Sequence, residues 1–164
     1  MDTHWYAVYT RSRHEKAIGR LFSERSIDYY LPLIGMTSQW KDRKKYIERP
    51  LFPGYVFVNI DEADFQTVLS TDGVVRILGY GYTPTPLPER EVMDLQRVVE
   101  SDIELDPYPH FGAGDEVYIN RGVLEGVRGR IVERRGVYRL ILSVDMMKKS
   151  VAVEIDVDDV ELCS

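Results

Sequence analysis

The stretch that decides the fold is PLFPGYVFVNI, residues 50–60, which enters a strand through a turn. Successive side chains of a strand point to opposite faces, so Val56 and Val58 share one face, while Tyr55 and Phe57 share the other. A half-buried strand alternates apolar with polar residues, whereas this strand is apolar on both faces. Either the fold or a binding partner must therefore cover the aromatic face.

The composition indicates a soluble globular protein of one or two domains. The chain has 164 residues, of which 44% are hydrophobic and 29% are charged. No apolar run approaches the ~20 residues that cross a bilayer, and the N-terminus does not resemble a signal peptide. The single cysteine, Cys163, rules out an intrachain disulfide and favours a reducing, cytoplasmic location. The three histidines, His4, His14 and His110, give no metal-ligand spacing, so no metal or other cofactor is expected.

Charge is distributed unevenly along the chain. The net charge of −6 argues against indiscriminate binding to nucleic acid. Residues 1–49 carry 10 Lys and Arg against 6 Asp and Glu, whereas residues 102–164 carry 8 against 13. We therefore expect any contact with nucleic acid near the N-terminus.

The first hundred residues predict an antiparallel-rich sheet with helices packed against it. The basic segment 35–49 is interpreted as a mobile hairpin or loop. A stripe of cations on the first helix, Arg13, Lys16 and Arg20, is either a solvated face or a binding face. The expected strands cover residues 5–10, 27–33, 54–60 and 74–78, and the expected helices cover residues 13–26, 62–70 and 88–101.

The rest of the chain changes character. Residues 102–110, DIELDPYPH, are acidic, contain prolines and are interpreted as a linker. Residues 111–164 offer five short strands separated by glycine turns, which indicates a small β-barrel. The predicted fold class is thus α+β: an N-terminal α/β sandwich over residues 1–101, followed by an SH3-like barrel.

The sequence contains no recognisable catalytic constellation. There is no nucleophile elbow, no phosphate-binding loop, no dinucleotide fingerprint and no H-E-x-x-H motif. We therefore expect a binding protein rather than an enzyme.

Two motifs in order resemble the NusG/RfaH family of transcription elongation factors. The first is FPGYVFV after an N-terminal WYAVYT strand, and the second is GAGDEVYINRGVLEGVRGRIVER, which resembles a KOW motif. In the second motif, Gly122, Gly126 and Gly129 would serve turn geometry and close backbone approach. The motifs and the linker between them cover nearly the whole chain.

The resemblance implies that the N-terminal domain binds the β′ clamp helices of RNA polymerase through an aromatic depression. Aromatic side chains suit such an interface because they carry a large contact area at a low entropy cost. On the alternative interpretation, Phe52 and Phe57 belong partly to the core. The matching positions are Tyr9, Phe52, Pro53, Tyr55, Phe57 and Tyr80.

The resemblance also implies contact with the non-template DNA strand in the transcription bubble. A groove of cations with a stacking ring is a suitable way to hold single-stranded DNA. The comparable residues are Arg11, Arg13, His14, Lys16 and Arg20.

The KOW domain of the family recruits a ribosomal protein or the termination factor Rho. The matching residues either form an exposed apolar patch or close the core of the barrel. These residues are Leu124, Val127, Met146, Met147 and Lys149.

The short linker and the absence of an N-terminal extension resemble specialised antiterminator paralogues more than the general factor. Because residues 137–155 are rich in β-branched side chains, we expect the C-terminal domain to rest as a barrel. We expect a monomer that does not bind membranes. The alternative is an RNA- or ribosome-associated KOW protein, against which the acidic second domain weighs.

Overall fold

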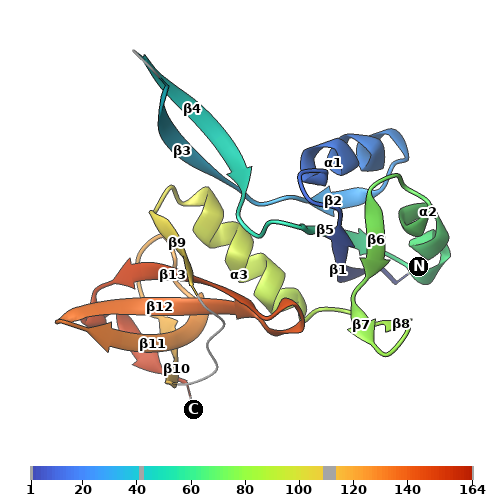
Figure 1. Cartoon of the computed structure of the whole chain (residues 1–164). Coiled ribbons are helices and arrows are strands. Elements are labelled where there is room, and N and C mark those ends of the chain that lie inside the picture. The colour runs from blue at the N-terminus through green and yellow to red at the C-terminus, as the bar shows by residue number, and fades with distance from the viewer. Residues whose placement is uncertain (1, 41–42, 109–113, 164) are drawn as a thin grey trace. The chain divides into compact units, whose positions relative to one another are not determined.

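The computed structural model describes residues 2–40, 43–108 and 114–163, and its backbone forms two compact units (Figure 1). The first unit covers residues 1–88 and the second covers residues 89–164.

The first unit is built on a four-stranded antiparallel sheet with the strand order β2-β5-β1-β6. In β5, Val56, Val58 and Ile60 are buried together with Tyr6 and Val8 of β1, which confirms the predicted strand and its alternation. The strands are β1 (His4–Thr10), β2 (Asp28–Tyr30), β5 (Tyr55–Ile60) and β6 (Val74–Ile77).

Helix α1 (Glu15–Glu24) covers this apolar face of the sheet. Ile18 and Phe22, one helical turn apart, are fully buried in the same core as the β5 side chains. Glu15 lies on the buried side of the same helix, and its Oε1 has no hydrogen-bond partner among the described residues. Periodicity correctly predicts the helix and its core, but not the burial of this carboxylate.

The predicted short helix after β5 forms as a 3₁₀ turn, η1 (Glu62–Asp64), followed by α2 (Phe65–Leu69). The Asp61 side chain accepts a hydrogen bond from the Ala63 N–H at 2.8 Å, which confirms it as the N-cap.

The basic segment forms a long hairpin of β3 (Leu33–Trp40) and β4 (Arg43–Pro50), which projects as an arm in Figure 1. A second, smaller hairpin consists of β7 (Gly79–Tyr80) and β8 (Thr83–Pro84). The first hairpin was one of the two predicted forms of residues 35–49, and the second lies in a segment expected to be a loop.

The second unit combines helix α3 (Glu89–Glu100) with a six-stranded antiparallel sheet in the order β14-β10-β11-β12-β13-β9. All five strands that the sequence predicts are present. The strands are β9 (Leu105–Tyr108), β10 (Asp115–Ile119), β11 (Arg128–Arg134), β12 (Val137–Val144), β13 (Lys149–Ile155) and β14 (Val160–Leu162), with 3₁₀ turns η2 (Asp145–Met147) and η3 (Val157–Asp159).

The glycines of the KOW-like motif serve two different purposes. Gly122 and Gly126 have φ angles of +90° and +89°, which L side chains rarely adopt. At Gly129 an added Cβ would lie 2.5 Å from the carbonyl oxygen of Ile141, so this strand position requires a residue without a side chain. The prediction that these glycines serve turn geometry is confirmed at Gly122 and Gly126, and the prediction of close backbone approach is confirmed at Gly129.

The contacts divide the chain earlier than the expected domain boundary at residue 101, because α3 packs against β12 and so belongs to the second unit. The segment expected to be a linker, residues 102–110, contains strand β9, which pairs with β13. Residues 109–110 of that segment, and residues 111–113 and 164 of the expected barrel, lie outside the described residues.

Candidate interaction surfaces

Two tyrosines on neighbouring strands form the centre of the predicted aromatic surface. Tyr9 lies opposite Tyr55 in the β1–β5 ladder, and their ring centroids are 5.4 Å apart. Tyr9 is 40% exposed and Tyr55 is half-buried. Partial burial, and secondarily the neighbouring Tyr9, raise the pKa of Tyr55 above its usual value. The two rings therefore form a partly exposed aromatic patch on this face of the sheet.

The two phenylalanines of the predicted surface lie in the interior. Phe57 is completely buried and Phe52 is 4% exposed. Their rings meet edge to face at 6.5 Å, and Tyr30 stacks on Phe57 at 6.0 Å. This burial favours the alternative that the phenylalanines belong to the core, beneath the position of Tyr55.

The turn before β5 places the remaining residues of FPGY. Pro53 is exposed, whereas Gly54 is buried with a φ angle of +88°. A Cβ on Gly54 would lie 3.4 Å from the Tyr9 ring, and the Gly54 carbonyl accepts a hydrogen bond from the Thr10 N–H at 2.9 Å. The turn therefore packs directly against the end of β1, beside Tyr9.

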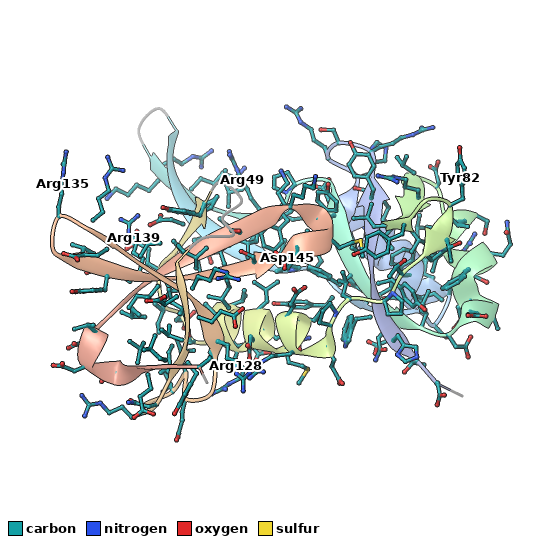
Figure 2. The ribbon with its side chains drawn as sticks, turned by 90° about the horizontal axis from the view of Figure 1, so that it is seen from below. Arg49, Tyr82, Arg128, Arg135, Arg139 and Asp145 are labelled. Atoms are coloured by element: carbon teal, nitrogen blue, oxygen red, sulfur yellow. The ribbon has the colours of Figure 1, made fainter. Side chains whose placement is uncertain are left out.

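Tyr80 lies on the small β7–β8 hairpin and is 76% exposed. Tyr82, at the tip of this hairpin, is fully exposed and projects outward in Figure 2. The structure thus brings Tyr9, Tyr55 and the FPGY turn together, and places Tyr80 on a separate element.

Sequence reasoning missed Arg76, which extends the tyrosine pair by one strand. Arg76 lies opposite Tyr9 in the β1–β6 ladder and is exposed. Its positive charge acts on the Tyr55 hydroxyl in the direction that lowers the pKa. Tyr55, Tyr9 and Arg76 therefore form a row across three adjacent strands. The sequence could not predict this position of Arg76, because it depends on the register in which β6 pairs with β1.

The residues predicted to contact DNA lie on α1 and on the segment that leads into it. The helix begins at Glu15 and not at Arg13 as predicted, and Arg13 has a φ angle of +65°, so only Lys16 and Arg20 of the predicted stripe lie on the helix. Arg11, Arg13, Lys16 and Arg20 are exposed, and His14 is half-buried at the helix N-terminus, where its Nδ1 lies 2.9 Å from the Ser12 carbonyl oxygen. The backbone N–H of Arg11 donates to the Gly73 carbonyl at 2.8 Å, which fixes the entrance to the helix against β6.

One of these cations also fixes the basic hairpin. The Lys16 Nζ donates to the Glu48 carbonyl oxygen of β4 at 2.7 Å. This contact links the helix that carries the cation stripe to the hairpin that carries Arg43, Lys44 and Arg49, all of which lie on β4. The first unit therefore presents its positive charge on two elements that contact each other.

The predicted partner-binding residues of the second unit are divided between its core and its surface. Leu124, Val127 and Met147 are at most 5% exposed. Met146 is half-buried and Lys149 is exposed. The three buried side chains fit the alternative that they close the core of the sheet. The neighbouring Val123 is 77% exposed, which the sequence did not indicate.

The described part of the chain contains no group of three or more His, Cys, Asp or Glu side chains that could hold a metal ion. Over the same residues, no helix is both long and apolar enough to cross a membrane.

Comparisons with known proteins give one family. Residues 3–96 match the model of the family described as "Transcription termination factor nusG". The transcription termination/antitermination protein NusG of Neisseria meningitidis is 30% identical, and the match covers 98% of each chain. NusG of Campylobacter jejuni is 31% identical, again over 98% of each chain.

A solved structure shows the same fold. The structure titled "Domain interaction in Thermotoga maritima NusG" matches with a TM-score of 0.58 and 23% identity, covering 100% of this chain and 99% of the other. The family model and the relatives are those of transcription termination and antitermination proteins. This chain therefore belongs to the NusG family of transcription termination and antitermination proteins.

Proposed function

We propose that this chain acts in transcription elongation and antitermination by binding the β′ clamp helices of RNA polymerase through its first unit. The observation that carries this proposal is the contact between Tyr9 and Tyr55 on a sheet face that leaves both rings accessible. Aromatic pairs of this kind act as interface anchors because they bury a large area with few rotatable bonds. We place the protein in the cytoplasm, with its transcription machinery.

The buried phenylalanines have a supporting role in this proposal. Phe52 and Phe57 hold the backbone from which Tyr55 and Pro53 project, and they do not touch the partner themselves. Tyr9, Tyr55 and Pro53 make the contact, with Tyr80 as a further exposed ring on its own hairpin.

Binding of the full chain to an isolated β′ clamp-helix fragment tests the proposal. The Tyr9→Ala/Tyr55→Ala variant is expected to lose binding, because it removes the paired rings and leaves the buried phenylalanines in place. Tyr46→Ala is the matched control, since Tyr46 is 67% exposed but lies on the β3–β4 hairpin. Failure of the wild-type chain to bind would overturn the proposal.

We further propose that the cations on α1 and on the segment before it hold the non-template DNA strand. The guanidinium groups of Arg11, Arg13 and Arg20 are exposed and can neutralise phosphates, whereas Lys16 already bonds to the hairpin.

For the second unit we propose recruitment of a ribosomal protein or Rho through Met146 and Lys149. These are the two accessible members of the predicted set. The binding of either partner to a Lys149→Glu variant, compared with a Lys148→Glu control at the neighbouring exposed position, tests this assignment. Equal binding by both variants would contradict it.

A further inference from the structure

The β3–β4 hairpin is positively charged on a chain that is acidic as a whole. Its two strands contain four Lys and Arg residues and one acidic residue, Glu48, so their balance is +3, whereas the whole chain has a net charge of −6. All four cations lie on β4 and are exposed. A local excess of one charge attracts a partner of the opposite charge, so the hairpin is suited to an anionic partner.

The cations of β4 are distributed over both faces of the hairpin. Successive side chains of a strand point to opposite faces, so Arg43, Lys45 and Arg49 share one face. Lys44 shares the other face with Tyr46, which is 67% exposed. None of the residues of β4, all of which the structure describes, is buried. An anionic partner can therefore be contacted from both faces of the hairpin.

The hairpin is an ordered arm whose base is fixed to the first unit. Its strands pair without a break from Leu33 opposite Pro50 to Trp40 opposite Arg43. At the base, the Lys16 Nζ of α1 donates a hydrogen bond to the Glu48 carbonyl oxygen at 2.7 Å. The cations of β4 are therefore held in a defined position relative to the helix that carries Lys16.

The dimensions of the arm fit the major groove of a DNA duplex. Arg43 and Arg49 lie six positions apart on β4, which spans about 20 Å at ~3.4 Å per residue. Along B-DNA this length covers about six base pairs, since each strand advances ~3.4 Å per nucleotide. The major groove is about 12 Å wide and admits a two-stranded β-ribbon. Cations on both faces of such a ribbon can reach the phosphates of both strands that border the groove.

Two other nucleic acids fit the hairpin less well. Single strands are held in basic grooves where their bases stack on aromatic rings, whereas this hairpin projects as an arm (Figure 1). An RNA duplex has a deep and narrow major groove that protein side chains cannot enter. The shape of the arm therefore favours double-stranded DNA over both.

We propose that the β3–β4 hairpin binds double-stranded DNA by entering its major groove, with Arg43, Lys44 and Arg49 on the phosphates. Contacts to phosphates carry no sequence information directly, so this binding does not depend on the DNA sequence. The proposal goes beyond the proposed function, which assigns a single strand to the cations on α1 and before it. It rests on the cations of the hairpin alone and does not require the polymerase contact.

Fluorescence anisotropy of a short labelled DNA duplex, titrated with the full chain at several salt concentrations, tests the proposal. The Arg43→Gln/Lys44→Gln/Arg49→Gln variant should bind the duplex more weakly and with a smaller salt dependence. Each lost phosphate contact lowers the slope of log K against log salt by about 0.9, which corresponds to a roughly eightfold loss of affinity near 0.1 M salt. Because the three side chains are exposed, the variant should unfold at the same temperature as wild type.

Two further variants separate the hairpin from the general charge of the chain. Arg134→Gln/Arg135→Gln/Lys148→Gln removes the same charge from exposed positions of the second unit and should keep most of the affinity and of the salt slope. Glu48→Lys should tighten duplex binding and steepen the slope, because it replaces the one acidic residue of the described hairpin. The Glu48 side chain is exposed, and it is its backbone carbonyl that receives the Lys16 hydrogen bond, so this contact is kept.

Three results would overturn the proposal. The first is wild-type affinity and salt slope for the duplex in the folded hairpin variant. The second is a loss that affects single-stranded DNA but not the duplex, which would make the hairpin part of the single-strand site. The third is equally tight binding of an RNA duplex of the same sequence, which would exclude entry into the major groove. None of these measurements uses polymerase, so their outcome is separate from that of the clamp-helix experiment.

Discussion

At the scale of single residues, burial separates side chains that a strand pattern treats alike. Tyr55 and Phe57 are two residues apart on one face of β5, yet Tyr55 is accessible and Phe57 is completely buried. Alternation assigns each side chain to a face, but it cannot say how far the cover over that face extends. The sequence therefore predicts correctly that Tyr55 and Phe57 share a face. It cannot predict which of the two side chains is exposed and which is buried.

Glu91 gives a prediction about pH. Burial, followed by the charge of Asp145, raises its pKa from 4.5 to about 7. A raised pKa in the folded state means that stability is complete below about 4.5 and falls as the pH rises to about 7. Glu91→Gln should therefore stabilise the second unit at pH 8, by up to about 1 kcal/mol once solvent screening is allowed for, and should flatten this dependence.

Denaturant unfolding of the full chain at pH 5 and pH 8 measures this effect. The other titratable groups that line the cleft beside Glu91 are left unchanged. Glu89→Gln, at an exposed position of the same helix, should shift stability little at either pH. An equal loss of stability with pH in wild type and Glu91→Gln would contradict the assignment. The unchanged groups are Arg90, Asp94, Glu116, Arg128, Arg130, Asp145 and Cys163.

Gly129 gives a prediction about packing. An alanine Cβ there would lie 2.5 Å from the Ile141 carbonyl oxygen and 3.0 Å from the Leu140 side chain. Because a backbone oxygen cannot move without disturbing the β11–β12 ladder, Gly129→Ala should cost about 1–3 kcal/mol. Thermal or denaturant unfolding measures the loss. Gly136→Ala meets nothing within 4 Å but lies at a φ of +79°, so its loss measures backbone strain without a steric clash. An unchanged stability of Gly129→Ala would rule out the steric explanation.

At the scale of elements, local signals are sufficient for most strands and helices. The alternation of β5, the Asp61 cap and the glycine turns of the KOW-like motif are all encoded within a few residues. Strand β9 was missed because Pro107 cannot donate a ladder hydrogen bond, which argues against a strand. The structure tolerates Pro107 because β9 is at the edge of the sheet, where β13 is its one neighbour among the described strands. The edge position of β9 can be recognised only from its pairing with β13, which the local sequence does not show.

The exposed arginines on α1 and before it lead to a prediction about the binding of nucleic acid. Arg13→Glu/Arg20→Glu should weaken binding of single-stranded DNA and reduce its dependence on salt, since each lost phosphate contact lowers the slope of log K against log salt by about 0.7. Fluorescence anisotropy with a labelled oligonucleotide at several salt concentrations measures both. Arg134→Glu/Arg135→Glu makes the same charge change on the second unit and should have a smaller effect. Equal weakening by both pairs would indicate nonspecific attraction.

At the scale of the whole molecule, the chain divides into two units whose boundary precedes α3. The family match extends through residue 96 and so includes most of this helix. The periodicity of Val92, Leu95 and Val98 shows that α3 has an apolar face, but not which surface that face covers. The contact between α3 and β12 joins residues far apart in the sequence, so the sequence does not reveal it. The expected domain boundary at residue 101 was therefore placed at the predicted end of the helix.

This division predicts that α3 and β9 support the sheet of the second unit. A fragment of residues 89–164 should be more stable than one of residues 111–164 by at least about 2 kcal/mol. The shorter fragment exposes Ile141 and Ala152, and burying one apolar side chain contributes about 1.5–3 kcal/mol. Urea unfolding of the two fragments provides the comparison. Equal midpoints would show that α3 contributes nothing to the sheet.

In the proposed function, the Tyr9–Tyr55 pair is the anchor for RNA polymerase. Its most direct test is the affinity of the full chain for an isolated β′ clamp-helix fragment, determined by calorimetric titration. We expect wild type and Tyr46→Ala to bind equally, and Tyr9→Ala/Tyr55→Ala to bind at least 30-fold more weakly, since loss of an anchoring residue costs about 2 kcal/mol or more. Unchanged affinity in the folded double variant would contradict the assignment of the surface. No binding by the wild-type chain would instead favour an RNA- or ribosome-associated role.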